Sequence, residues 1–288
     1  AQRRRTHRPP HTTPKRKTRT GGHIMSAALA LARRELSSLL RTPAGWIIAA
    51  LYAFLTTAVF ALRTLDPGQP ASMRFFFATA ASLLAVVMPA VSMRLLAEEA
   101  RAGTLEPLLT SPASHGSIIV GKFAGVLAYT ALMLLPTLAL VVTLIAVSDR
   151  APDPGPIIAG YLSLMLVAAL YLALGTLTSA CTSSQTLAFL AAFLIAVGHL
   201  IGTAQLAPRL PEPASSWIAA SAINPRVADF PRRIIDLQHV AFFTILTAWL
   251  LLLATSAPPL PRTPPCPTPP PPLPPQTPPS PTPPSATP

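Results

Sequence analysis

The chain has 288 residues, of which 51% are hydrophobic and only 11% are charged. Soluble domains average about 25% charged residues, so this composition excludes a single soluble core. The charges lie between apolar runs, and each run approaches the roughly 20 residues that a helix needs to cross a bilayer. The sequence therefore predicts an all-α polytopic membrane protein.

The net charge of +12 is concentrated at the N-terminus, where eight of the 22 Lys and Arg residues fall within the first 24 positions. A basic arm of this kind can indicate nucleic-acid binding or contact with anionic lipid headgroups. This arm contains no aromatic residue and has no folded module beside it, so we expect no nucleic-acid partner. Residues 1–24 are expected to be a disordered arm or a non-native leader, such as a vector remnant or a mis-assigned start.

Residues 27–41 have the pattern of a short amphipathic helix with basic residues. One face carries Leu29, Ala32, Leu36, Leu39 and Leu40, and the opposite face carries Arg34, Ser37, Ser38 and Arg41. Such a helix suits the membrane interface, although a soluble helix packed on a core has the same pattern. Because an apolar run follows directly, we expect an interfacial helix whose charged residues are Arg33, Arg34, Glu35 and Arg41.

Six apolar runs predict six transmembrane helices. A proline within the third, Pro136, is expected to kink it. The predicted spans are residues 44–62, 75–93, 122–147, 157–179, 184–206 and 239–257. A polar stretch with several prolines, 207–238, connects the last two.

The positions of the basic residues predict the orientation. Arg33, Arg34 and Arg41 precede the first span, and basic residues near spans favour the cytoplasmic side. Six spans then place both termini in the cytoplasm. This orientation places the arginines of 207–238 outside, which the same rule disfavours. The predicted orientation therefore rests mainly on the basic residues of the N-terminal half.

The last part of the chain, 258–288, holds half of the 36 prolines. This composition favours polyproline II and forms neither helix nor sheet. We expect a disordered extension or a frame-shifted end, and a docking tail for aromatic-lined grooves is the functional alternative. The two cysteines, Cys181 and Cys266, have no CxxC partner, so they indicate neither a metal site nor a disulfide framework.

The segment between spans two and three, residues 94–117, is rich in charged and helix-capping residues. Arg94 and Glu98 form an i,i+4 pair, so the helix of span two can continue beyond the membrane surface. Gly103 can end that helix, and Thr104 can cap a short second one. These signals predict a rigid helical elbow on the cytoplasmic side, called the elbow segment below.

Two glycine pairs and one apparent phosphate-binding motif lie at or inside the spans. Residues 116–122 fit GxxxxGK, but Phe123 replaces the Ser or Thr that would bind magnesium, and the motif precedes a span rather than following a strand. We therefore expect no ATP binding here, and expect Lys122 to extend to the membrane interface. Close helix contacts, within the bundle or across a dimer, are expected at the two small-residue pairs, Gly121 with Gly125 and Gly198 with Gly202.

His199 lies between the second pair of glycines, and it is either a functional group or a hydrogen-bonded packing residue. The spans otherwise contain almost no charge, which argues against a carrier driven by protons or sodium. No HExxH, GxSxG or intramembrane carboxylate pair is present. We expect neither a catalytic site, a metal nor a cofactor in this chain.

The run AEEARAGTLEPLLTSPASHGSIIVGK resembles the cytoplasmic segment of type-2 ABC exporter permeases. The resemblance is carried by an acidic pair, Gly-Thr-Leu-Glu, Leu-Leu, a proline and a final Gly-Lys. The start, RRELSSLLRTPAGWII, resembles the interfacial entry helix of the same family. The best match within the family is the gliding-motility-type group, whose approach to span six the late run ADFPRRIIDLQHVAFF resembles. The resemblance covers about 27–257, and the proline-rich tail departs from the short basic tail of the family.

The resemblance implies a permease domain over 25–257 in the inner membrane of a bacterium. Its expected partners are a separate ATP-binding cassette ATPase and a second permease, in a homo- or heterodimer. A non-transporting anchor or assembly subunit is the alternative, and co-purification with an ATPase would discriminate between them. The residues expected to shape the ATPase contact are Glu98, Glu99, Gly103, Thr104, Glu106 and Pro112.

Overall fold

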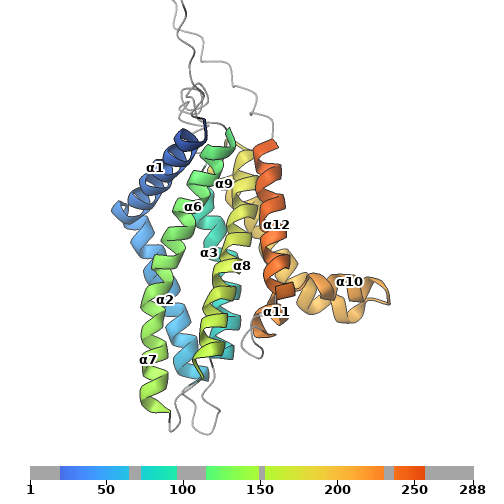
Figure 1. Ribbon diagram of the computed structural model, residues 1–288. Coiled ribbons are helices and arrows are strands. Elements are labelled where there is room, and N and C mark those ends of the chain that lie inside the picture. Colours follow the sequence, from blue (N-terminus) through green and yellow to red (C-terminus); the bar gives the residue numbers. More distant parts are fainter. Residues whose placement is uncertain (1–19, 65–72, 96–114, 149–152, 230–236, 257–288) are drawn as a thin grey trace, which may run out of the picture.

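The computed structural model describes residues 20–64, 73–95, 115–148, 153–229 and 237–256, and the side chains from residue 28 onward. Within these ranges the chain is helical and contains no strand. The membrane-spanning helices run side by side as one bundle (Figure 1). The predicted basic arm up to residue 19 and the proline-rich tail lie outside the described residues.

Six helical segments are long and apolar enough to cross a membrane, so the prediction of six spans is confirmed. They are α2 (Pro43–Arg63), α3 (Arg74–Ser92), α6 with α7 (Gly116–Val147), α8 (Pro154–Ala180), α9 with two short turns (Gln185–Arg209) and α12 (Leu237–Ser256). Helices suit lipid because each helix satisfies its own backbone hydrogen bonds.

Proline and capping residues account for several helix boundaries. At Pro136 the third span is divided into α6 (His115–Leu134), a 3₁₀ turn (Leu135–Thr137) and α7 (Leu138–Val147), as predicted. Proline lacks the N–H for an α-helical hydrogen bond and clashes with the preceding turn, so the helix changes type there. Asp153 caps α8 by accepting a hydrogen bond from the Gly155 backbone N–H at 3.0 Å.

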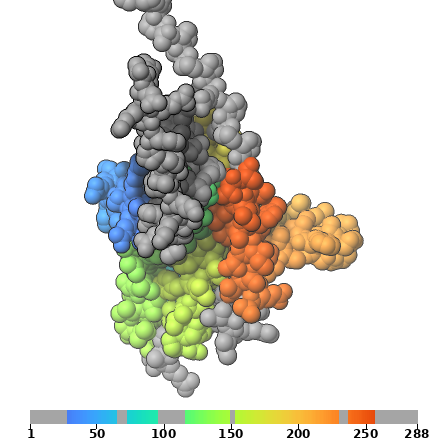
Figure 2. Space-filling view, turned by 45° about the horizontal axis from the view of Figure 1, so that its top comes forward, coloured from blue at the N-terminus to red at the C-terminus, as the bar shows by residue number. Residues whose placement is uncertain are grey.

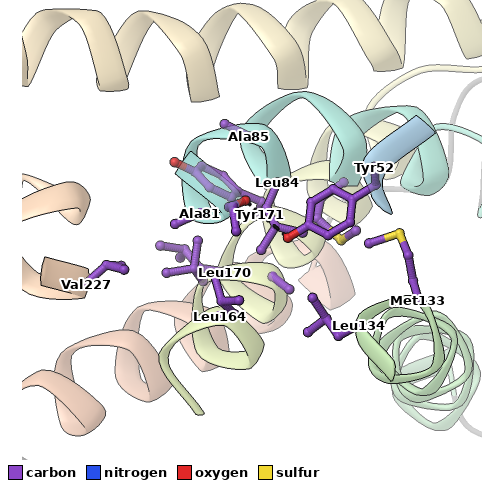
Figure 3. Close-up of a cluster of buried hydrophobic side chains, with 14 of the residues drawn as sticks. Tyr52, Ala81, Leu84, Ala85, Met133, Leu134, Leu164, Leu170, Tyr171 and Val227 are labelled. Atoms are coloured by element: carbon purple, nitrogen blue, oxygen red, sulfur yellow. Dashed lines mark hydrogen bonds between the residues drawn. The ribbon is translucent and has the colours of Figure 1, made fainter. Parts of the chain in front are cut away.

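The core lies around α3 and α8, which run in the same direction. Buried side chains from α2, α3, α6, α8 and α11 meet there, including Tyr52, Leu84, Met133, Leu164 and Val227 (Figure 3). Just over half (56%) of each of spans α3 and α8 is buried, against 11% of α12. The two central helices are therefore held by protein contacts, whereas α12 mainly faces outward.

Glycines allow α3 and α8 to approach closely. A Cβ atom added at Gly160 would collide with the ring of Phe77, and one added at Gly175 would collide with the side chain of Ser92. Helices in lipid gain no hydrophobic free energy from association, so close van der Waals packing has to hold them together.

The stretch 207–238 contains structure that the sequence pattern did not predict. It forms α10 (Ala214–Ser221) and α11 (Ile223–Asp229). Ile223 and Val227 of α11 are buried against the core, whereas α10 projects sideways beyond α12 (Figure 2). Short helices broken by prolines have too little periodicity to be predicted from the sequence. The position of α11 against the core is seen only from its buried apolar contacts in the structure.

The close α3–α8 contact predicts unequal effects for two identical substitutions. Gly175→Ala should destabilise the fold by about 1–3 kcal/mol, because the new methyl group overpacks the contact with Ser92. Gly198→Ala is the matched control, since an added Cβ there meets no atom within 4 Å. Thermal unfolding of the purified protein in detergent measures both, and equal midpoints for the two variants would contradict the packing described here.

Candidate functional site

The elbow segment is the candidate site that the sequence singles out, but most of it lies outside the described residues. This applies to every elbow residue predicted to form the ATPase contact: Glu98, Glu99, Gly103, Thr104, Glu106 and Pro112. The structure does describe the helices that enter and leave the segment. Leu95 is the last described residue after α3, and α6 begins at His115.

The first turns of α6 pack against α1 (Thr20–Arg41), the helix that precedes the first span. A Cβ added at Gly121 would lie 2.8 Å from the carbonyl oxygen of Ala28, and one added at Gly125 would lie 2.6 Å from that of Ala32. Because residue numbers rise together along the contact, the two helices run in the same direction. We call this contact the α1–α6 crossing.

An ion pair joins the two helices at the α1–α6 crossing. Lys122 Nζ lies 2.5 Å from Glu35 Oε1, and the Lys122 side chain is only 4% exposed. The expectation that Lys122 reaches the membrane interface is therefore wrong, because Glu35 on α1 binds its ammonium group inside the protein. The other charged residues predicted for this helix, Arg33, Arg34 and Arg41, are exposed.

The helix α1 begins at Thr20, earlier than the predicted start at 27, so part of the predicted basic arm is helical. Most of its predicted apolar face is correct, since Leu36, Leu39 and Leu40 pack against the core. Leu29 is the exception, with 56% of its surface exposed.

A tight joint connects α1 to α2. Only Thr42 separates the two helices, and its hydroxyl donates to the Leu39 carbonyl oxygen at 3.1 Å. The indole N–H of Trp46 donates to the Leu40 carbonyl oxygen at 2.7 Å. The Tyr129 hydroxyl of α6 donates to the Gly45 carbonyl oxygen at 2.6 Å. The start of α2 is thus attached both to α1 and to α6.

The GxxxxGK sequence, residues 116–122, lies within the helix α6. A phosphate-binding loop needs free backbone N–H groups that point toward the phosphate. The motif begins in the first turn of α6, but Gly121 and Lys122 lie in the second turn, where the N–H groups bond to carbonyl oxygens of the preceding turn. Since Glu35 also binds the lysine, this motif has the conformation of a membrane helix and not of a nucleotide site.

The second glycine pair, Gly198 and Gly202, does not form a contact between described helices, because a Cβ added at either position meets nothing within 4 Å. Between them, the ring Nε2 of His199 lies 3.3 Å from the Ser221 hydroxyl. This hydrogen bond connects α9 to the end of α10. It gives His199 a packing role at the base of the lateral hairpin, by which we mean residues 202–221.

The lateral hairpin carries both polar and apolar groups at its surface. Trp217 has 77% of its surface exposed, and Leu206 has 52%. Ser215 donates a hydrogen bond to Glu212 at 2.6 Å. Hydrogen bonds from Ser215 and Ser216 hold the pKa of the Glu212 carboxyl below its usual value, so this exposed group is ionised at neutral pH. Among the described residues, no three His, Cys, Asp or Glu side chains form a group that could hold a metal ion.

The fold and the flanks of the elbow segment define a multi-pass membrane protein with a helix packed on the entry to its third span. A comparison with protein families shows which group it is in. The family described as "ABC-2 family transporter protein" matches residues 29–256, so the chain belongs to this family and is a type-2 ABC permease. A search of the curated proteins finds no match.

The attachment of α6 to α2 predicts different results for two tyrosine substitutions. Tyr129→Phe should destabilise the fold by about 0.5–1.5 kcal/mol, because it removes the hydrogen bond to Gly45. Tyr171→Phe is the matched control, since the buried Tyr171 hydroxyl has no hydrogen-bond partner among the described residues. Thermal unfolding in detergent compares them, and a larger loss for Tyr171→Phe would argue against this attachment.

Proposed function

We propose that the chain is the membrane-spanning subunit of an ATP-driven exporter, which moves substrate across the inner membrane of a bacterium with energy from a separate ATPase. Family membership carries the proposal. Within the family, we propose the gliding-motility-type group, which the run ADFPRRIIDLQHVAFF resembles. In this scheme two permeases, identical or different, pair with two ATPase subunits and hold the substrate between them.

The position of the elbow segment supports energy transfer through protein contact. The segment connects α3, a central helix of the core, to α6, which is attached to α1 and α2. A push on this segment would therefore reach three spans at once. Its charged residues suit a protein partner, because complementary charges orient such contacts.

The orientation follows from the basic residues and the even number of spans. The start of α1, the start of α6 and the end of α12 lie at one end of the bundle (Figure 1). The helix α1, which carries the exposed Arg33, Arg34 and Arg41, packs against the first turns of α6. The positive-inside rule favours the cytoplasm for the side on which this basic helix precedes the first span.

Cysteine labelling tests this orientation. Cys181, which is exposed in the turn between α8 and α9, should react with a membrane-impermeant maleimide only after lysis. Ser148→Cys, placed at the end of α7, should react in intact spheroplasts. Each variant carries one cysteine, with the others changed to serine. Labelling of Cys181 from outside would reverse the proposed orientation.

Substitutions in the elbow segment test the function. Glu98→Ala combined with Glu99→Ala should weaken ATPase recruitment by about 2–5 kcal/mol if both charges are buried in the contact. Gly103→Val should misdirect the segment, because valine is strained in a left-handed helix end. We expect normal membrane insertion in both variants, with loss of ATPase recruitment or of ATP-dependent transport.

Glu212→Ala is the control, since it removes an exposed carboxylate from the lateral hairpin, on the opposite side of the membrane in this orientation. Pull-down of the ATPase and ATP turnover in proteoliposomes are the measurements. Recruitment and transport at wild-type levels in both elbow variants would refute the proposed coupling role. An unmodified chain that inserts but recruits no ATPase would instead favour a non-transporting anchor.

A further inference from the structure

The Lys122–Glu35 ion pair lies at a mechanically important position. Lys122 is in the second turn of α6, close after the elbow segment, and Glu35 is in α1, close before the first span. The ion pair therefore connects the helix that leaves the elbow segment to the helix that continues into α2.

The ion pair is poorly suited to a role in stability alone. Removing a charge from water is costly, and replacing both partners of a buried pair by apolar residues is often neutral or stabilising. In some proteins a buried polar group instead fixes the register of two packed helices. Such a group is needed at the α1–α6 crossing if the other contact residues permit more than one register.

Small residues alone leave the register of the crossing undefined. Small side chains recur on α6 at Ser117, Gly121 and Gly125, with a spacing of four residues. Ala28 and Ala32 of α1 have the same spacing, so they fit against Gly121 and Gly125 or, after a slip of about 6 Å, against Ser117 and Gly121.

Only the observed register brings the two charges together. After the slip, Leu39 would take the place of Glu35 beside Lys122, so the Lys122–Glu35 ion pair would be broken. Breaking a buried ion pair is strongly unfavourable. The ion pair thus selects one of two registers that the small residues would otherwise permit.

From this geometry we infer that Glu35 and Lys122 are a positioning pair that fixes the register of α1 on α6 and so transmits movement of the elbow segment to α2. The inference rests on the proposed function for its coupling role. The register itself is independent of any ATPase. The joint at Thr42 attaches the start of α2 to α1, and Tyr129 of α6 donates to Gly45 there, so a slip of α1 along α6 would shift the start of α2 and break this hydrogen bond.

Two double variants separate positioning from folding. Glu35→Leu with Lys122→Met removes both charges and retains apolar bulk, so it should insert and fold. Glu35→Lys with Lys122→Glu reverses the pair and should preserve the register. Spin labels on Leu29→Cys and Val120→Cys, two exposed positions on α1 and α6, report the register, with Cys181 and Cys266 changed to serine.

The unmodified pair and the reversed pair should each give one narrow distance between the labels. The apolar variant should give a second distance, displaced by up to about 6 Å. Its transport-coupled ATP hydrolysis in proteoliposomes should fall at least about tenfold, while pull-down of the ATPase is unchanged. The reversed pair should restore coupling.

Unchanged coupling in the apolar variant overturns the inference, whatever the distances show. A single unchanged distance in that variant, or failure of the reversed pair to restore coupling, also overturns it. Failure of the proposed function is distinguishable, because the unmodified chain would then recruit no ATPase while the distance measurement still reports the register.

Discussion

Helix backbones in this bundle approach closely where glycine or alanine faces a neighbouring helix, and the bilayer makes that approach necessary. Lipid tails are as apolar as leucine, so two helices gain little by burying apolar surface against each other. Van der Waals contact remains, and it is strongest where no side chain separates the backbones. The α1–α6 crossing follows this rule, whereas at the α3–α8 contact the glycines make room for the side chains of Phe77 and Ser92.

The two contacts differ in what fixes their register. Between α3 and α8, the large ring of Phe77 lies against Gly160, so shape alone defines how the helices align. Between α1 and α6, small residues make the closest backbone approaches, and the Lys122–Glu35 ion pair adds a contact that depends on which residues lie opposite each other. An ion pair can therefore serve to align the helices at the α1–α6 crossing, whereas the α3–α8 contact needs none.

The sequence predicted the elements of this fold better than their contacts. Hydrophobic run length predicted all six spans, and the chemistry of proline predicted the break at Pro136, since both are local properties of the chain. The family resemblance seen in the sequence was confirmed by the match over residues 29–256.

Contacts between helices depend on which faces meet, and periodicity does not contain that information. The pair Gly121 and Gly125 has the same spacing as Gly198 and Gly202, yet only the first lies against another described helix. The partner of Lys122 was missed for the same reason, although Glu35 had been noted among the charged residues of α1. The one available signal was a lone lysine at the start of an apolar helix, which requires an acidic partner if it is buried.

The central claim is that α1, the start of α2 and the first turns of α6 form one rigid unit that carries movement from the elbow segment into the membrane. Spin-label distances in the permease–ATPase complex, without nucleotide and with ATP trapped, test it most directly. The account predicts that the distance from Ile47 of α2 to Val120 of α6 is the same in both states. It predicts that the distance from Ile47 to Leu252 of α12, which packs chiefly against α8, differs between them. A change in the first distance, or no change in either, would contradict the account.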